Sequence, residues 1–151
     1  MTDEHRPTIT DVLGKDHRDL DALWDRVEAT PATDRPNRQR IFAAFRSGLL
    51  AHIVEEEEHL FPRFDETDPT LRTLVDRLLA EHREIREVLD RIDRSLRTGD
   101  GAIEELGFEL VNALGEHNAR EESFAYPWLD GRLSPEQVRE VQRRLGPRDR
   151  F

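Results

Sequence analysis

The sequence has no cysteine among its 151 residues. This absence excludes disulfides, iron-sulfur clusters, thiolate zinc sites and thiol catalysis, so any metal ion must be held by nitrogen and oxygen atoms. Aromatic residues make up only 7% of the chain, which is low for a β-sandwich or barrel but ordinary for helices with solvated outer faces. The length suits a single domain, and we predict one all-α domain over residues 1–151.

The chain also lacks a free-standing basic cluster and a long apolar run. Lys and Arg number 23 against 33 Asp and Glu, which gives a net charge of -10. This charge repels a phosphate backbone, so we expect no nucleic-acid partner. No apolar run approaches the roughly 20 residues that cross a bilayer, and residues 1–10 form a polar segment without an apolar core. We therefore expect no membrane partner and a cytoplasmic location.

Cap and turn signals divide the chain into helical segments. Breaks followed by helix-start signals occur at Thr10, Asp34-Arg35-Pro36, Asp68-Pro69 and Thr98-Gly99-Asp100-Gly101. They predict helices near 10–29, 35–64, 69–97 and 101–126. Pro62 and Pro127 should end or kink the second and fourth helices, because proline has no amide hydrogen for the helical ladder. Ser134-Pro135-Glu136 begins a short fifth helix that extends to about Leu145.

On each long helix the apolar residues recur in steps of three and four, the pattern that buries one face of a helix in a bundle. Histidine or glutamate interrupts this apolar stripe on all four long helices, at positions that should face the core. These positions are His17, His52, Glu56, His82, His117 and Glu121. The pattern predicts an antiparallel four-helix bundle with a polar layer in its interior.

The two halves of the chain match at a constant offset of 65 residues. The matching pairs are His17 and His82, His52 and His117, Glu56 and Glu121, and Pro62 and Pro127. The chain therefore reads as two related helical hairpins. Residues equidistant from the turn of an antiparallel hairpin lie at one level, and the midpoints between neighbouring stripe histidines fall in or beside the expected turns. We predict that the four histidines share one layer, with each glutamate one turn along.

Two carboxylates facing each other in an apolar core require neutralisation, which metal cations provide. Each hairpin offers two imidazoles and one carboxylate, so six ligands suit two ions and leave coordination positions open for small molecules. This donor set favours iron, manganese or zinc over magnesium and calcium, with carboxylate, oxo or hydroxo groups as bridges. The predicted metal ligands are His17, His52, Glu56, His82, His117 and Glu121.

These residues resemble hemerythrin-like domains, also called HHE cation-binding domains, over residues 10–127. The matching motifs are His17, His52-x-x-x-Glu56 ahead of Leu60-Phe61-Pro62, His82, and His117-x-x-x-Glu121 ahead of Tyr126-Pro127. The resemblance implies an up-down-up-down bundle around a non-haem di-iron centre, with iron preferred to manganese or zinc. It also implies a reaction with dioxygen, nitric oxide or peroxide.

One departure from the oxygen-carrying members concerns the third helix, where a second histidine is expected one turn after the first and this chain has Arg86. His59 lies on the stripe of the second helix and is a possible additional ligand; otherwise it is an exposed or supporting residue. Glu56-x-x-His59 also satisfies a motif of ferritin-like proteins, but its second copy fails at Phe124. A ferritin-type ferroxidase is therefore disfavoured.

The other acidic residues near the motifs have simpler interpretations. Asp16, Asp21 and Glu81 flank the histidines; we interpret them as outward-facing charges, with orienting or bridging as the alternative role. Successive helical residues are about 100° apart, so only Glu56 of the acidic run sits on the stripe. The rest of the run is interpreted as a solvated face: Glu55, Glu57 and Glu58.

Three classes of function are consistent with this sequence. The first is a protein that binds or senses dioxygen or nitric oxide at a di-iron centre. The second is an oxidoreductase acting on peroxide or nitric oxide, in which Tyr126 or His59 handles protons. The third is an iron-responsive regulatory or storage module whose fold depends on metal loading.

Overall fold

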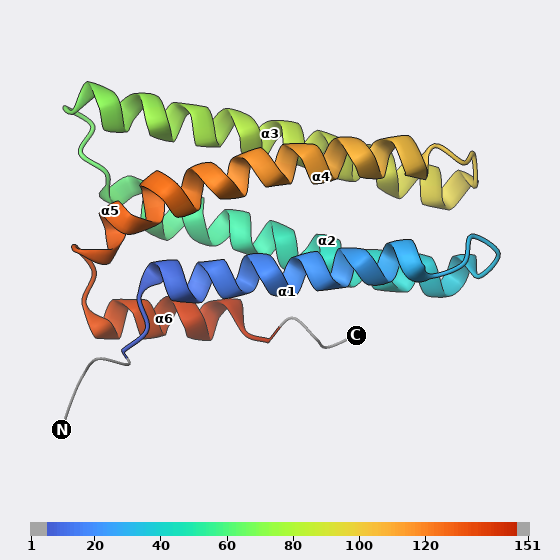
Figure 1. The fold of residues 1–151 in the computed structure, drawn as a ribbon, viewed down its shortest axis with the longest axis horizontal. Coiled ribbons are helices and arrows are strands. Elements are labelled where there is room, and N and C mark those ends of the chain that lie inside the picture. The colour runs from blue at the N-terminus through green and yellow to red at the C-terminus, as the bar shows by residue number, and fades with distance from the viewer. Residues whose placement is uncertain (1–5, 148–151) are drawn as a thin grey trace.

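The computed structural model describes residues 6–147, which form no strand. Its α-helices are α1 (Ile9–Ala29), α2 (Arg35–Glu55), α3 (Pro69–Thr98), α4 (Ile103–Arg120), α5 (Tyr126–Asp130) and α6 (Pro135–Leu145). The helices α1 to α4 run antiparallel as a four-helix bundle, and α6 lies beside α1 and α2 (Figure 1). The predicted fold class, a helical bundle with a short C-terminal helix, is confirmed.

Both helices that carry a glutamate ligand candidate change type at that residue. The chain continues from α2 as the π-helix η1 (Glu56–Leu60) and the 3₁₀ turn η2 (Phe61–Arg63), and from α4 as the π-helix η3 (Glu121–Ala125). The last amide before each proline closes the wide turn, since Phe61 N–H donates to the Glu56 carbonyl and Tyr126 N–H to the Glu121 carbonyl. Pro62 lies in the 3₁₀ turn with which this helix ends at Arg63, whereas Pro127 lies in α5, which carries the chain on to Asp130.

Most helix ends lie where the turn chemistry places them, with two corrections. Asp68 caps α3, and Ser134 forms a capping box at the start of α6. The cap of α1 is Thr8 rather than Thr10, because the Thr8 hydroxyl accepts from the Asp11 amide. The predicted fourth helix does not end at residue 126, because its chain continues through η3 and α5 to Asp130.

Two apolar clusters fill the bundle, one on each side of the histidine layer. The first cluster lies toward the turns after α1 and α3 and contains Trp24, whose ring packs so closely against Gly107 that an added Cβ would lie 2.9 Å from it. The second cluster lies under α5 and α6. His82 follows Leu78 of the second cluster and precedes Ile85 of the first. The layer is therefore enclosed along the bundle axis by apolar side chains.

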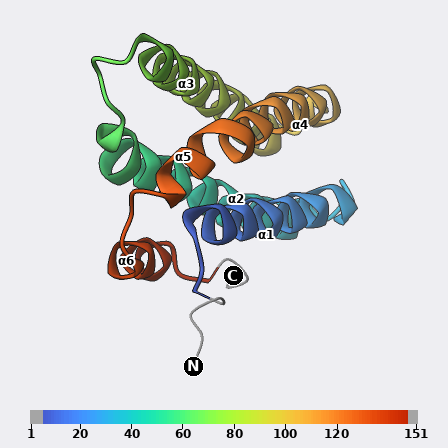
Figure 2. The ribbon, with the colours of Figure 1, turned by 60° about the vertical axis from the view of Figure 1, so that its left-hand side comes forward.

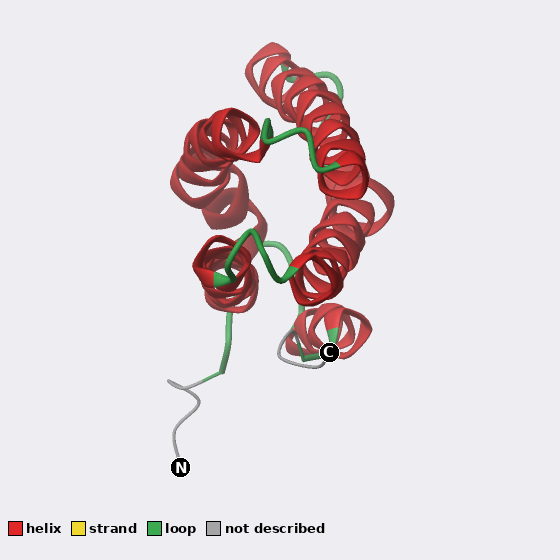
Figure 3. Cartoon of the chain, turned by 90° about the vertical axis from the view of Figure 1, so that its right-hand side faces the viewer, coloured by secondary structure: helices red, strands yellow, loops and turns green. Residues whose placement is uncertain are grey.

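The two hairpins are closely packed within themselves and less so against each other. α1 packs along α2 and α3 along α4, and α2 and α3 join the hairpins, while α1 and α4 make far fewer contacts (Figures 2 and 3). No helix within residues 6–147 combines the length and the apolarity needed to cross a membrane.

Candidate metal centre

The structure brings all six predicted ligands together in the interior. They form two donor sets, and within each set one ligand atom from every residue lies within 4.8 Å of the others. The first set is His17, His52, Glu56 and Glu121, and the second is His82, His117, Glu56 and Glu121. We call these sets position 1 and position 2. All six residues are buried, and both glutamates belong to both positions.

Each glutamate turns one oxygen toward each position. Glu56 Oε2 lies 3.2 Å from His52 Nε2, and Glu56 Oε1 lies 3.0 Å from His82 Nε2. Glu121 Oε1 lies 3.2 Å from His17 Nε2, and Glu121 Oε2 lies 3.1 Å from His117 Nε2. Each carboxylate thus offers one oxygen to the histidines of position 1 and the other oxygen to those of position 2. This is the arrangement of a ligand that bridges two ions.

A further carboxylate holds the outer nitrogen of each of the four converging histidines. The Nδ1 atoms lie 2.7 to 2.8 Å from a carboxylate oxygen in the pairs His17 and Glu122, His52 and Asp16, His82 and Glu57, and His117 and Glu81. An imidazole that donates its Nδ1 proton to a carboxylate keeps the lone pair of Nε2 free for a metal ion and its ring in a fixed orientation. All four Nε2 atoms therefore face the interior, where they are available to a metal ion.

These outer carboxylates correct three of our interpretations. Asp16 and Glu81 do not face outward, and Glu57 is not part of a purely solvated face, because each reaches across to a histidine on a neighbouring helix. Glu122, which the sequence analysis did not consider, does the same. The available signal was the repeat, since Asp16 and Glu81, like Glu57 and Glu122, are separated by the same 65 residues as the ligands.

Two further residues of the acidic segment depart from expectation. Glu55 is only 4% exposed and accepts hydrogen bonds from Arg144 of α6, with Nη2 at 2.7 Å from Oε2, so it lies in an interface rather than on a solvated face. His59 is exposed and belongs to neither donor set. The π-helical turn that begins at Glu56 explains this, because its wider geometry rotates later residues off the α-helical stripe and places Leu60 in the core.

Tyr126 makes the two positions different. Its buried hydroxyl lies 2.5 Å from Glu56 Oε2 and 2.8 Å from Glu121 Oε1, and 3.1 and 3.3 Å from the Nε2 atoms of His17 and His52. The hydroxyl thus adjoins position 1. The repeat equivalent of Tyr126 is Phe61, whose ring stacks on His82 with 5.6 Å between ring centroids. Position 2 accordingly has an apolar ring where position 1 has a hydroxyl group.

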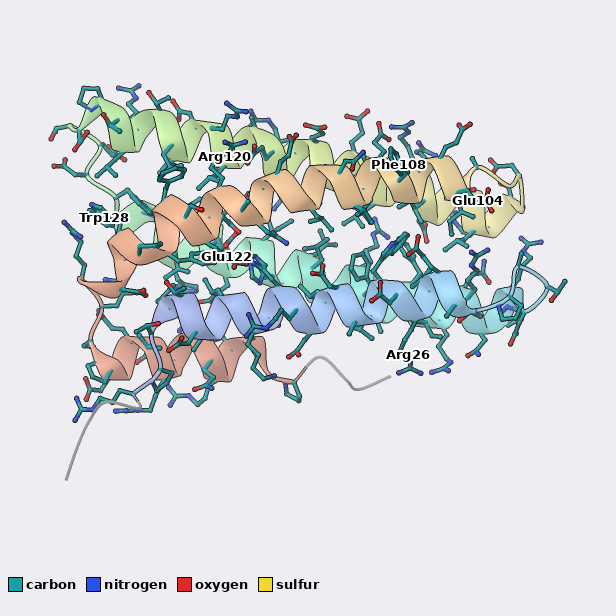
Figure 4. The ribbon with its side chains drawn as sticks, in the orientation of Figure 1. Arg26, Glu104, Phe108, Arg120, Glu122 and Trp128 are labelled. Carbon is teal, nitrogen blue, oxygen red and sulfur yellow. The ribbon has the colours of Figure 1, made fainter. Side chains whose placement is uncertain are left out.

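Arginines hold both carboxylates behind position 2. Arg86 donates to both oxygens of Glu57 at 3.0 and 3.1 Å, and Arg120 donates to Glu81 at 3.0 and 3.2 Å. Arg120 lies between α4 and α3 (Figure 4). Both carboxylates that support position 2 are therefore ion-paired. Arg86, which stands where a fifth histidine was expected, supports the carboxylate behind a ligand candidate and does not enter the donor set.

The protonation of the site follows from its burial and its two glutamates. Burial disfavours a charge on His52, but Glu56 and Asp16 outweigh it and raise the pKa of His52 to about 10. Burial likewise opposes a charge on His117, yet Glu121 raises its pKa to about 9. Burial alone would raise the pKa of Glu56, whereas His52 and His82 hold it well below its usual value. Without a metal ion, imidazolium charges balance the buried carboxylates.

The hydrogen bonds among the six residues leave one buried oxygen atom without a partner, which a cation would supply. Glu121 Oε2 is buried and has no hydrogen-bond partner among residues 6–147, although His117 Nε2 lies only 3.1 Å away. The two atoms are close but not aligned as donor and acceptor. A cation between them would satisfy both, because a carboxylate oxygen and an imidazole nitrogen are both ligands of iron, manganese and zinc.

Comparison with known proteins agrees with this geometry. The family model described as the hemerythrin HHE cation-binding domain matches residues 8–129, a segment that contains all six converging residues. No curated protein and no solved structure gives a significant match. The family match covers most of the chain. The chain belongs to the hemerythrin HHE cation-binding domain family.

Proposed function

We propose that this protein is a non-haem di-iron protein that binds or senses dioxygen or nitric oxide. The observation that supports this function is the sharing of Glu56 and Glu121 between two positions, each of which two imidazoles complete. Shared carboxylates hold two ions close together, and a set of imidazoles and carboxylates suits iron. An iron pair, when bound, supplies the electrons that a diatomic ligand accepts.

The residues of the chain would contribute binding, orientation and exclusion of water. The four Nε2 atoms and the two carboxylates would hold the ions, while the outer carboxylates on Nδ1 fix the rings. Two imidazoles and two shared carboxylates leave each ion with open coordination positions for a small ligand or bridging solvent. The two apolar clusters shield the layer from bulk water along the bundle axis.

Metal analysis and spectroscopy together test this proposal. Protein produced in iron-replete medium should contain about two iron ions per chain, as expected for two positions with four donors each. After anaerobic reduction, addition of nitric oxide or dioxygen should change the near-ultraviolet and visible absorption reversibly. His59→Ala is the matched control, because His59 is an exposed histidine outside both positions. Rapid oxidation without a reversible spectral change, or loading with zinc alone, would refute the proposal.

A second candidate is an oxidoreductase that acts on peroxide or nitric oxide, and the position of Tyr126 supports it. Its hydroxyl is a proton donor 2.5 Å from Glu56, inside a site closed to bulk water. Burial and the carboxylates of Glu121 and Glu56 raise the pKa of Tyr126 well above its usual value, so the phenol stays protonated beside the two carboxylates. Sustained oxygen evolution from peroxide by the iron-loaded protein would favour this candidate over the first.

A further inference from the structure

A cavity of about 500 Å³ opens between α1 and α4, two neighbouring helices that make few contacts with each other. Its wall on α1 includes His17, Asp21 and Asp25, and its opposite wall includes Gly115 of α4 and Glu122 of η3. Glu122 lies in the space between α4 and α1 (Figure 4). We call this cavity the α1–α4 groove.

The α1–α4 groove reaches the metal centre through His17. This residue lines the groove and is also a donor of position 1, so a single imidazole ring separates the two. The side chain of Glu122 is 42% exposed, yet its carboxylate lies 2.7 Å from His17 Nδ1, which makes it the link between solvent and the centre. The cavity of about 350 Å³ beside position 2 differs, because Phe61 lines it and covers His82 and no donor residue forms its wall.

The groove has a negative lining. Asp21, Asp25 and Glu122 contribute carboxylates, against the single guanidinium of Arg18. The pKa of Asp21 is raised, by partial burial first and by repulsion from Asp25 and Glu122, while His17 opposes the rise. Carboxylates that repel one another along a cleft concentrate cations there and repel anions. The centre at the end of the groove has two buried carboxylates, one with an oxygen that lacks a hydrogen bond among the described residues.

We propose that the α1–α4 groove is the route by which divalent metal ions enter the centre, with Glu122 as the last carboxylate before His17. This inference rests on the proposed metal centre but not on the identity of its gaseous ligand. The acidic lining steers the hydrated cation to the groove, and the space beside Gly115 admits it. An added Cβ at Gly115 would meet no atom within 4 Å, so a large side chain there would project into open space rather than into the core.

Cobalt(II) uptake by the metal-free protein tests the route. Cobalt(II) absorbs visibly when imidazole and carboxylate bind it, so stopped-flow mixing reports the rate of entry. The double variant Asp21→Asn, Asp25→Asn should take up cobalt about fivefold more slowly, with a weaker dependence on ionic strength, because two steering charges are lost. Gly115→Trp should slow uptake by a similar factor through steric blockage. The final cobalt content should match that of the wild type in both cases.

The chain offers matched controls for charge and for bulk. Glu84→Gln, Glu87→Gln removes two exposed carboxylates from α3, and Ala43→Trp adds an indole to the exposed face of α2. Both controls should load at the wild-type rate. Groove variants that load within twofold of the wild type, or controls that slow equally, would overturn the route. Because each variant can also be loaded with iron(II) and exposed to nitric oxide in a separate experiment, failure of the route and failure of the proposed function give different results.

Discussion

Position 1 and position 2 have the same kinds of candidate ligand but different surroundings. Both consist of two histidines and the same pair of glutamates, but position 1 adjoins the hydroxyl of Tyr126 and the α1–α4 groove. Position 2 lies under the ring of Phe61 and is supported by carboxylates paired with arginine. The two hairpins thus bring their candidate ligands together where the repeat predicts them, whereas the residues around these candidates differ between the two halves.

The difference has a consequence for the ions. Arg86 and Arg120 share the charge of the carboxylates behind position 2, so these carboxylates should polarise its imidazoles less than unpaired carboxylates would. The hydroxyl of Tyr126 offers position 1 a hydrogen-bond donor that position 2 lacks. We therefore expect the two positions to hold metal in equal number but to respond differently to small ligands.

The largest expected effect tests the equivalence of the two ligand sets. His52→Ala and His117→Ala each remove one of four donors from one position, and each variant should lose about one of two ions, since a site stripped of a ligand binds metal far more weakly. Elemental analysis of purified protein measures this directly. His59→Ala should keep both ions. If either ligand variant kept full two-metal loading, the symmetry between the positions would be wrong.

The second prediction concerns pH. Because His52 and His117 have pKa values of about 10 and 9, an ion at either position must displace a proton, and its apparent affinity should rise about tenfold per pH unit between pH 6 and 8. The stability of the metal-free protein, by contrast, should fall as the pH rises. Both pKa values are raised above 6.5, so their stabilisation is complete below pH 6.5 and is lost as pH rises through 9 and 10.

Chelator competition and urea unfolding at several pH values test both halves of this prediction. The metal-free protein should unfold at lower urea concentration at pH 9.5 than at pH 7, while the loaded protein should gain affinity for its ions. A metal-free protein whose unfolding midpoint stayed level or rose over this range would contradict the charge balance inferred for the layer.

The convergence of the six residues could be predicted because it depends on regular geometry. The α-helical period selects the stripe, and the midpoint rule of an antiparallel hairpin sets the level of His17 against His52 and of His82 against His117. Neither step needs knowledge of side-chain conformation. The repeat then supplies a second, independent reading of the same layer.

The residues around the ligands were harder to predict, and the reasons are physical. A π-helical turn leaves no mark in apolar periodicity, so the stripe wrongly included His59. Glu57 and Glu81 have side chains long enough to reach a neighbouring helix, and an angular projection of one helix does not show this. Glu55 pairs with Arg144 of α6, and no pattern within α2 indicates where a later helix docks.

The third prediction concerns the carboxylates that hold the histidines of each position. Asp16 and Glu81 are repeat equivalents that hold the Nδ1 atoms of His52 and His117. Asp16→Ala and Glu81→Ala should each weaken the ion at the corresponding position by about 10- to 100-fold, because the ring loses its orientation and basicity. Isothermal titration with cobalt(II) would resolve the two affinities. A loss at both positions from a single substitution would show that the positions are coupled rather than separately supported.

The smallest effect addresses the hydroxyl that distinguishes the positions. Tyr126→Phe should keep both ions but change the nitric oxide affinity by about twofold to tenfold, the range expected for one hydrogen bond. Phe61→Tyr is the converse change, because Phe61 stacks on His82 at the same 5.6 Å centroid distance that separates Tyr126 from His17. If the hydroxyl alone distinguishes the positions, the double variant should exchange their spectroscopic signatures. If both signatures stay as they are in the wild type, the hydroxyl does not cause the asymmetry, which must then arise from other surroundings of the two positions, such as the groove beside His17.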